Sequence, residues 1–223
     1  MRNPWLDIAA DDYVGHMTSP EVGQLPVLSR LLGEALDEFR PGDLLLIGCS
    51  TGNGLCHVDP VVTHRVTGVD INPEYLRRLA EQFPHPGFEL TLTCADVMAY
   101  RFAADTFDLV HCALLFEYLD WPRLVGEVGR TVRTGGGLSV VLQRPSDVVP
   151  AVTPTTYASL RRLESLFQFV DPAAVIARAR VCGFELRSQR AEPLNSGKAF
   201  DVLHFRKVDP SVDDSSAKGR SMS

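Results

Sequence analysis

Short aliphatic runs alternate with amphipathic stretches along most of the chain. The run over residues 43–48 (DLLLIG) is apolar at almost every position, which is typical of a strand buried on both faces of a parallel sheet. Similar runs predict further strands over residues 64–70, 88–96, 107–115 and 137–143. Two last runs, over residues 184–189 and 199–207, are separated by only a short turn. The pattern therefore predicts seven strands.

Four amphipathic stretches predict helices. Residues 20–39 place apolar side chains at helical spacing, with Ser19 as the expected N-cap and Pro26 as an expected break or restart. The other three helices are expected over residues 73–83, 121–133 and 173–182. The last two of these follow a capping aspartate and end at a glycine that favours the left-handed conformation: Asp120 with Gly135, and Asp171 with Gly183.

This alternation predicts an α/β fold: a doubly wound, seven-stranded, mostly parallel sheet with helices on both faces. The last two strands lack a helix between them, so we expect them to pair as an antiparallel terminal hairpin. Residues 1–40 are expected to form an N-terminal helical cap and residues 41–208 the main domain, with a substrate-side insertion over residues 144–170. Residues 209–223 are small, polar and without periodicity, which predicts a disordered tail.

Charge and composition restrict the classes of binding partner that we expect. The 223 residues carry a formal net charge of -6, and their 22 Lys and Arg are scattered, so nucleic acid is not expected as a partner. No apolar signal segment or bilayer-length stretch is present, so we expect neither secretion nor a membrane partner. The five cysteines form no C-x-x-C pair, which favours no metal site and a reduced, cytoplasmic location.

The sequence LLLIGCSTGNG, residues 44–54, ends an apolar strand in a loop with three glycines. Such a loop lets the backbone approach a ligand closely. A triphosphate loop needs a lysine, which is absent here. The spacing G-x-x-x-G-x-G also fails to match the dinucleotide fingerprint G-x-G-x-x-G. Neither a triphosphate nor a pyrophosphate is therefore favoured.

Two aspartates follow the next two strands. Asp70 stands 22 residues after Gly48, where an acid of a doubly wound fold hydrogen-bonds ribose hydroxyls. Its alternative role is to cap the helix that begins at Pro73. Asp96 is placed to accept from an exocyclic amine such as that of adenine, and a turn-forming role is equally open. Together the two acids favour an adenosine.

Five segments in order resemble the motifs of class I S-adenosylmethionine-dependent methyltransferases: LLLIGCSTGNG, GVDINPEYL, CADV, FDLVHCALLFEYL and RTVRTGGGLSVVL. The resemblance runs from about Tyr13 to Lys207. It implies a Rossmann-like methyltransferase fold, with S-adenosylmethionine as cofactor and S-adenosylhomocysteine as product. Residues 41–208 would then be the cofactor-binding methyltransferase domain.

The resemblance also implies a cofactor site. The backbone of the glycine loop would lie close to the methionine part of the cofactor. The helix after the loop would bind the carboxylate of that methionine through free N–H groups. An aromatic residue of the N-terminal segment would lie near the sulfonium, although plain packing of that segment stays open. The residues implied are Tyr13, Gly48, Cys49, Ser50, Gly52, Gly54, Asp70, Ile71, Asp96, Val97 and Cys112.

The chain departs from the family pattern at two positions. Leu46 stands where the family usually has an acid that orients the amino group of the cofactor. Asp43 or a backbone carbonyl would have to substitute for that acid. Ser50 stands where glycine is common, and we expect it to be tolerated if the backbone there does not need a positive φ.

Three residues in or after the fourth strand are candidates for catalysis as a general base, His111, Glu117 and Tyr118, and His16 of the N-terminal segment is a fourth. His111 is better explained as a locally satisfied strand histidine, and Glu117 and Tyr118 equally well as a loop-to-helix boundary. Methyl transfer also proceeds without a base, because positioning and water exclusion supply much of the rate. Substrate contacts are expected from His16, Met17, Ala113 and Arg144, the last as the holder of a substrate carboxylate.

Residues 157–167 have apolar positions that predict a helix over the substrate, or half of a homodimer contact. The chain lacks the Asn/Asp-Pro-Pro-Tyr run and the Pro-Cys pair of nucleic-acid methyltransferases, and acids for a catechol-bridging magnesium are not evident. We therefore expect methyl transfer to a small molecule by in-line displacement, with mainly positional catalysis. The alternative is a non-catalytic binding or partner protein of the same fold, which Leu46 keeps open.

Overall fold

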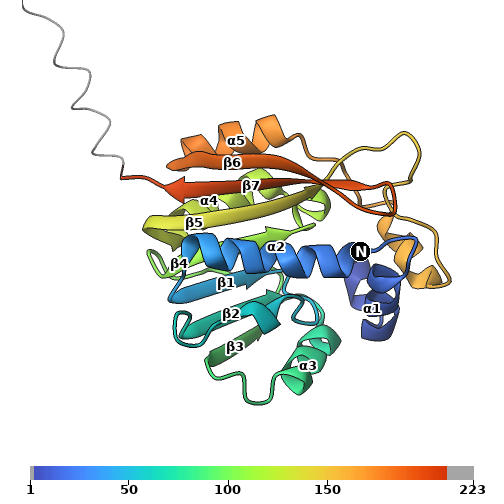
Figure 1. Ribbon diagram of the computed structural model, residues 1–223, viewed down its shortest axis with the longest axis horizontal. Helices are drawn as coiled ribbons and strands as arrows, with labels where there is room; N and C mark the ends of the chain where they lie inside the picture. The colour runs from blue at the N-terminus through green and yellow to red at the C-terminus, as the bar shows by residue number, and fades with distance from the viewer. Residues whose placement is uncertain (1–2, 210–223) are drawn as a thin grey trace, which may run out of the picture.

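A seven-stranded sheet runs through the computed structural model, which describes residues 3–209 (Figure 1). The strands are β1 (Asp43–Ile47), β2 (Arg65–Asp70), β3 (Glu89–Cys94), β4 (Phe107–Ala113), β5 (Val132–Gln143), β6 (Phe184–Pro193) and β7 (Ala199–Lys207). They lie in the order β3-β2-β1-β4-β5-β7-β6. Only β7 runs antiparallel to its neighbours β5 and β6. The predicted doubly wound sheet with a terminal hairpin is confirmed.

Helices cover both faces of this sheet (Figure 1). They are α1 (Ala10–Thr18), α2 (Gln24–Phe39), α3 (Pro73–Gln82), α4 (Trp121–Thr131) and α5 (Pro172–Val181). In β1, Leu44 and Leu46 pack in a core cluster with side chains of α2 and α3. Leu45 and Ile47 point the other way and join the cluster under α4 and α5. The uninterrupted apolar run of β1 thus serves two cores, because alternate side chains of a strand face opposite sides.

Two of the predicted helix ends are wrong. Ser19 does not cap α2 but ends α1, where its N–H donates to the carbonyls of Gly15 and His16. Helix α2 begins at Gln24 and runs without a break through Pro26, which lies in the first turn, where its missing N–H would have no partner in any case. Helix α4 ends at Thr131, so Gly135 (φ +81°) lies inside β5 rather than at the helix end.

Other helix predictions have mixed outcomes. Asp120 caps α4 by accepting from the N–H of Arg123 at 3.4 Å, and Asp171 caps α5 by accepting from Ala173 at 2.9 Å. Residues 157–167 form only a short 3-10 helix, η4 (Ala158–Leu163), instead of the expected α-helix. Within residues 3–209, no helix combines the length and apolarity needed to cross a membrane. Of the tail predicted over residues 209–223, positions 210–223 lie outside the described residues.

Strand β1 lies beside β4 in the sheet. From this point β2 and β3 are added on one side, and β5, β7 and β6 on the other, so the strand order reverses here. Ligands of doubly wound folds bind beyond the carboxyl ends of the strands at such a switch point. The 3-10 helix η1 (Pro4–Asp7) and α1 both contact η4 near this edge, and the Trp5 ring of η1 packs against Tyr13 of α1. They form a cover over the carboxyl ends of the strands.

Candidate cofactor and substrate site

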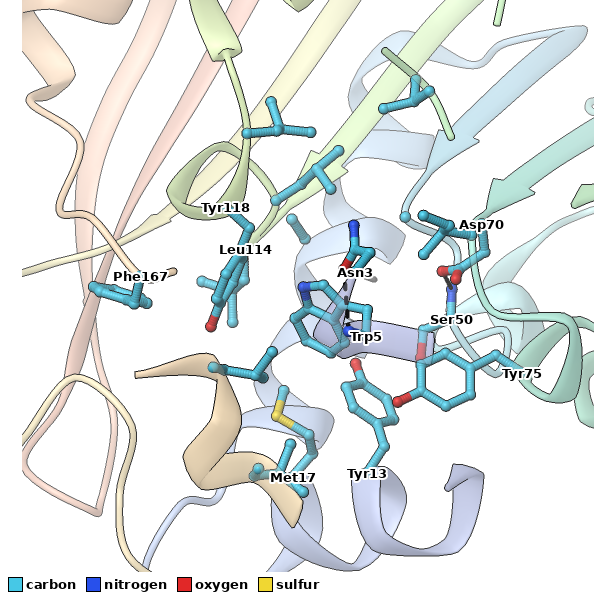
Figure 2. A pocket seen from close by; sticks show the side chains of 18 of the residues that line it. Asn3, Trp5, Tyr13, Met17, Ser50, Asp70, Tyr75, Leu114, Tyr118 and Phe167 are labelled. Atoms are coloured by element: carbon cyan, nitrogen blue, oxygen red, sulfur yellow. Dashed lines mark hydrogen bonds between the residues drawn. The ribbon is translucent and has the colours of Figure 1, made fainter. Parts of the chain in front are cut away.

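A cavity of about 340 Å³ lies beyond the carboxyl ends of five strands (Figure 2). Residues that follow or end these strands line it: Gly48 after β1, Asp70 in β2, Asp96 after β3, Ala113 in β4 and Gln143 in β5. Its volume falls within the roughly 300–1,000 Å³ typical of small-molecule sites. The cover adds Trp5, Tyr13, Leu160 and other side chains, so the cavity is walled on the side away from the sheet.

Asp70 is fixed at the end of β2 by two backbone groups. Its Oδ2 accepts from the N–H of Ser50 at 2.9 Å, and its Oδ1 accepts from the N–H of Asn72 at 2.8 Å. Asn72, not Asp70, caps α3 by accepting from the N–H of Glu74 at 2.9 Å. The alternative role of Asp70 as the cap is therefore wrong. Each carboxylate oxygen has a second lone pair, so the side chain can still accept from a ligand.

Two neighbouring segments complete this part of the cavity. Asp96 is exposed at the rim, and its Oδ1 accepts from the N–H of Met98 at 2.9 Å, so it forms a turn and also lines the cavity. Ile71 and Val97 also line this cavity. Burial raises the pKa of the Asp70 carboxyl above its usual value, against the lowering by the backbone N–H groups.

Only the first part of the glycine loop lines the cavity. Gly48, at φ +71°, lines the cavity. Ser50 has φ +48°, so the condition under which we expect a serine to be tolerated there is not met. Gly52 and Gly54 do not line the cavity, because they pack against other elements. A Cβ on Gly52 would lie 2.8 Å from Leu79 of α3, and one on Gly54 would lie 3.0 Å from Leu32 of α2.

The α-helix expected after the glycine loop is absent. Only the 3-10 helix η2 (Leu55–His57) lies between β1 and β2. A single short turn does not provide the aligned N–H groups of an α-helix terminus. The predicted carboxylate site at a helix N-terminus is therefore wrong for this chain.

The cover contributes an aromatic wall. The Trp5 ring lies 6.3 Å from that of Tyr13 and 5.1 Å from that of Tyr118, and Tyr13 lies 5.1 Å from Tyr75 (Figure 2). The Nδ2 of Asn72 anchors this wall by donating to the carbonyls of Trp5 at 2.9 Å and Ile8 at 3.0 Å. Burial raises the pKa of Tyr13 to about 12, so its hydroxyl is protonated at neutral pH.

The predicted substrate residues are only partly brought together. His16, Met17 and Ala113 line the cavity with Tyr118. Arg144 does not, because its exposed side chain turns to Asp201, with Nε 3.5 Å from Oδ2. The prediction that Arg144 lines the site is wrong.

Two of the three catalytic candidates from β4 and the loop after it lie outside this cavity. The Glu117 side chain is buried, and its Oε1 accepts from the N–H of Gln143 at 2.7 Å, which fixes the loop after β4 to β5. His111 contacts the hydroxyl of Ser139 at 3.0 Å, in agreement with a locally satisfied strand histidine. Tyr118 alone lines the cavity, and burial raises its pKa, so its hydroxyl stays protonated.

Two cysteines implied for the cofactor also lie elsewhere. Cys112 is buried in the core cluster under α4 and α5, on the opposite side of the strand from Ala113. Its predicted place beside the cofactor is wrong. Cys49 lines a second, smaller cavity of about 40 Å³, together with Leu46, His111 and Gly48. This small cavity shares Gly48 and Ser50 with the large one, so the two adjoin at the glycine loop.

Sequence reasoning missed Tyr75, Gln24 and Lys198, which all line the large cavity. Tyr75 lies on α3 and Gln24 at the start of α2, whereas Lys198 lies in the turn between β6 and β7. Tyr75 stands in the segment GVDINPEYL, but the resemblance implies no role for it, and no motif includes Gln24 or Lys198. The positions of all three side chains depend on how remote elements pack. Only the predicted hairpin, which places residues 194–198 at the same edge as the end of β5, gave a signal for Lys198.

Comparisons with known proteins agree with this geometry. A family model described as a methyltransferase domain matches residues 44–136, which include the glycine loop, Asp70 and Asp96. Phthiotriol/phenolphthiotriol dimycocerosates methyltransferase of Mycobacterium leprae is 29% identical over 113 residues, which are 48% of this chain and 39% of that protein. The chain therefore spans about two fifths of the length of this relative.

Solved structures share the fold. The N-methyltransferase NodS of Bradyrhizobium japonicum, in complex with S-adenosyl-L-homocysteine, has a TM-score of 0.70 at 18% identity, with 93% of this chain and 100% of that chain covered. The [4+2]-cyclase SpnF has a TM-score of 0.62 at 15% identity, with 81% of each chain covered. The predicted Rossmann-like methyltransferase fold is confirmed. Residues 44–136 are thus similar to the methyltransferase-domain family, and the whole sheet has the fold of class I S-adenosylmethionine-dependent methyltransferases.

Proposed function

We propose that this chain transfers the methyl group of S-adenosylmethionine to a small-molecule acceptor in the cavity beneath the cover. The observation that carries the proposal is the placement of Asp70, which is held by two backbone N–H groups on the wall that also includes Gly48 and Asp96. An acid at this point of a doubly wound fold is suited to ribose hydroxyls. We assign Ile71 and Val97 to the adenine and Asp96 to its amine.

The wall beside Asp70 has polar groups that suit a bound ligand. The Ser50 hydroxyl and the Tyr75 hydroxyl are buried and have no hydrogen-bond partner among the described residues. Both residues line the cavity next to Asp70 (Figure 2). Buried polar atoms without partners are rare in folded proteins and are explained when a ligand or water completes them. Their presence favours a polar ligand at this end of the cavity.

Because the Leu46 side chain is apolar, another group has to bind the amine of the cofactor. The small cavity at the glycine loop is lined by Leu46 and by His111 on the neighbouring strand, which pair across β1 and β4. Burial lowers the pKa of His111 to about 3, so its imidazole is neutral and one ring nitrogen can accept a hydrogen bond. We infer that His111 is the polar group for the amine in place of the usual acid, and not a catalytic base.

When bound, the cofactor would supply an activated sulfonium methyl group for in-line displacement by the acceptor, with its adenosine held by Asp70, Ile71, Asp96 and Val97. The aromatic wall of Trp5, Tyr13 and Tyr118 is suited to a neighbouring cation. Tyr118 keeps its proton, so it orients an acceptor as a hydrogen-bond donor rather than as a base. The cover excludes water, and catalysis is mainly positional.

Replacement of Asp70 tests this assignment. We expect Asp70→Ala to raise the dissociation constant of S-adenosylhomocysteine at least about tenfold, the order of a lost charge-assisted hydrogen bond. Isothermal titration calorimetry measures the change. Asp59→Ala is the matched control, because Asp59 also accepts from a backbone N–H, that of Val61 at 2.9 Å, but lies outside the cavity. Equal affinities of Asp70→Ala and the control would refute the ribose assignment.

A further inference from the structure

Lys198 is a buried amine on the wall of the large cavity. Its side chain comes from the turn between β6 and β7, and the residue is only 4% exposed. Its Nζ donates to the carbonyl of Ala151 at 2.8 Å and lies 3.5 Å from Oε1 of Gln143. Among residues 3–209, no carboxylate lies within ion-pair distance of this amine. The amine is therefore buried with neutral partners only.

Such an arrangement is unfavourable for a protein without a ligand. Removal of an ammonium group from water is offset only when the charge is paired or fully hydrogen-bonded. Two neutral oxygens satisfy at most two of its three N–H donors. Burial lowers the pKa of Lys198 to about 8, so the amine is still mostly charged at neutral pH. The cavity wall thus presents a positive charge with an unused donor.

Neutral polar side chains surround this amine and form the polar end of the cavity, which consists of His16, Gln24, Gln143 and Lys198. Gln143 accepts from Nε2 of Gln24 at 3.3 Å and donates to the carbonyl of Ala151 at 2.9 Å, so its amide is fixed. Burial and the neighbouring charge of Lys198 lower the pKa of His16 to about 4, so its imidazole is neutral. The net charge of the polar end is therefore that of Lys198.

The polar end lies far from the acids that are assigned to the cofactor. Asp70 and Asp96 follow β2 and β3, whereas Gln143 and Lys198 lie at the ends of β5 and β7, and strands β1 and β4 run between them. Apolar side chains also line the cavity, among them Met17, Leu114 and Phe167 (Figure 2), together with Leu160 and Leu163. This layout suits an acceptor with an apolar body and one anionic end.

We propose that Lys198, with the amide of Gln143, binds the carboxylate of a small acceptor that has an apolar body. The inference rests on the proposed function, because it assigns the acceptor to the same cavity. A carboxylate matches one ammonium and a fixed amide, whereas a phosphate dianion would require more positive charge than the polar end holds. Lys198 thus takes the role that the sequence suggests for Arg144, which pairs with Asp201 instead.

Matched acid and amide probes test the proposal. Phenylacetate and octanoate are titrated against phenylacetamide and octanamide by ligand-detected NMR, with the protein saturated with S-adenosylhomocysteine. We expect the wild-type protein to bind the carboxylates more tightly than the amides. Lys198→Met, which keeps the apolar stem but removes the charge, should weaken the carboxylates about tenfold and leave the amides unchanged.

Arg144→Met is the matched control, because it removes a cation at the same edge of the sheet but outside the cavity. We expect it to leave both probe classes unchanged. The proposal is overturned if acids and amides bind the wild-type protein equally, if neither binds at millimolar concentration, or if Arg144→Met causes the same loss as Lys198→Met.

The affinity for S-adenosylhomocysteine is measured first in every variant. Its retention in Lys198→Met shows that the fold and the cofactor end are intact. If the wild-type protein fails to bind S-adenosylhomocysteine, the proposed function fails, and the comparison of acids with amides is then made on the protein alone. The two failures are therefore distinguishable.

Discussion

Ser50 holds a backbone conformation that suits glycine better. Its φ of +48° lies in the left-handed region, and its buried hydroxyl has no partner among the described residues. A residue with a Cβ pays about 1–2 kcal/mol in this region. Its N–H donates to Asp70, so the strained residue also helps to position the carboxylate assigned to ribose. Backbone strain of this kind is often found at ligand sites.

We expect Ser50→Gly to increase the free energy of unfolding by about 0.5–1 kcal/mol, because the strain is relieved at the expense of some chain entropy. Urea denaturation without ligand measures the change. Ser50→Ala keeps the Cβ and the positive φ, so it should give no such increase. A loss of stability in Ser50→Gly relative to Ser50→Ala would contradict this account.

At the residue scale, the sequence predicted side chains that follow motifs and missed those that depend on packing. Asp70, Ile71, Asp96 and Ala113 all line the cavity, because the ends of parallel strands meet at one edge. Cys112 was misplaced because adjacent strand residues face opposite sides, so only one of Cys112 and Ala113 can face the cavity. Tyr75, Gln24 and Lys198 come from elements whose approach no local pattern encodes.

At the element scale, Asn72 couples helix α3 to the cover. Its Oδ1 caps α3, and its Nδ2 donates to the carbonyls of Trp5 and Ile8. One side chain therefore satisfies a helix terminus and also anchors the segment that walls the cavity. Asp171 is its counterpart on α5, with the same cap and the same following proline, but it lies away from the cover.

We expect both Asn72→Ala and Asp171→Ala to lower the free energy of unfolding by about 1–2 kcal/mol, the usual effect of a lost N-cap. Only Asn72→Ala should also speed amide hydrogen exchange of residues 3–18 and weaken S-adenosylhomocysteine. Hydrogen-exchange mass spectrometry and calorimetry measure these effects. Equal exchange of residues 3–18 in the two variants would show that Asn72 does not anchor the cover.

The regular elements were predictable because their patterns are uninterrupted. The buried run of β1 and the capping residues Asp120 and Asp171 give strong local signals. The missing helix after the glycine loop is explained by its sequence, since Pro60 disfavours helical backbone at Asp59 and β-branched residues follow it. In residues 157–167 the apolar spacing was present, but only one 3-10 segment formed, without a side-chain cap.

At the scale of the whole molecule, stability is linked to pH through Glu117. Burial raises the pKa of its carboxyl from 4.5 to about 7, in spite of the lowering by the N–H of Gln143. Because the folded protein favours the protonated form, this group contributes most stability below about pH 4.5 and loses that contribution as pH rises through about 7.

As pH rises from about 4.5 to about 7, we expect the free energy of unfolding of the wild-type protein to fall relative to that of Glu117→Gln. The difference should be on the order of a few kcal/mol, because each pH unit of such linkage is about 1.4 kcal/mol. Denaturation of both proteins across the pH range measures it. A constant difference between the two proteins, or one that grows in favour of the wild type, would contradict the assignment of a buried, protonated Glu117.

The proposed function requires the cavity at the carboxyl ends of the strands to bind S-adenosylmethionine although Leu46 stands in place of the usual acid. Titration of the wild-type protein with S-adenosylhomocysteine by isothermal calorimetry tests that requirement most directly. We predict saturable binding at one site per chain with a dissociation constant below the millimolar range. An absence of heat and of saturation at millimolar ligand would contradict it and would favour the non-catalytic alternative.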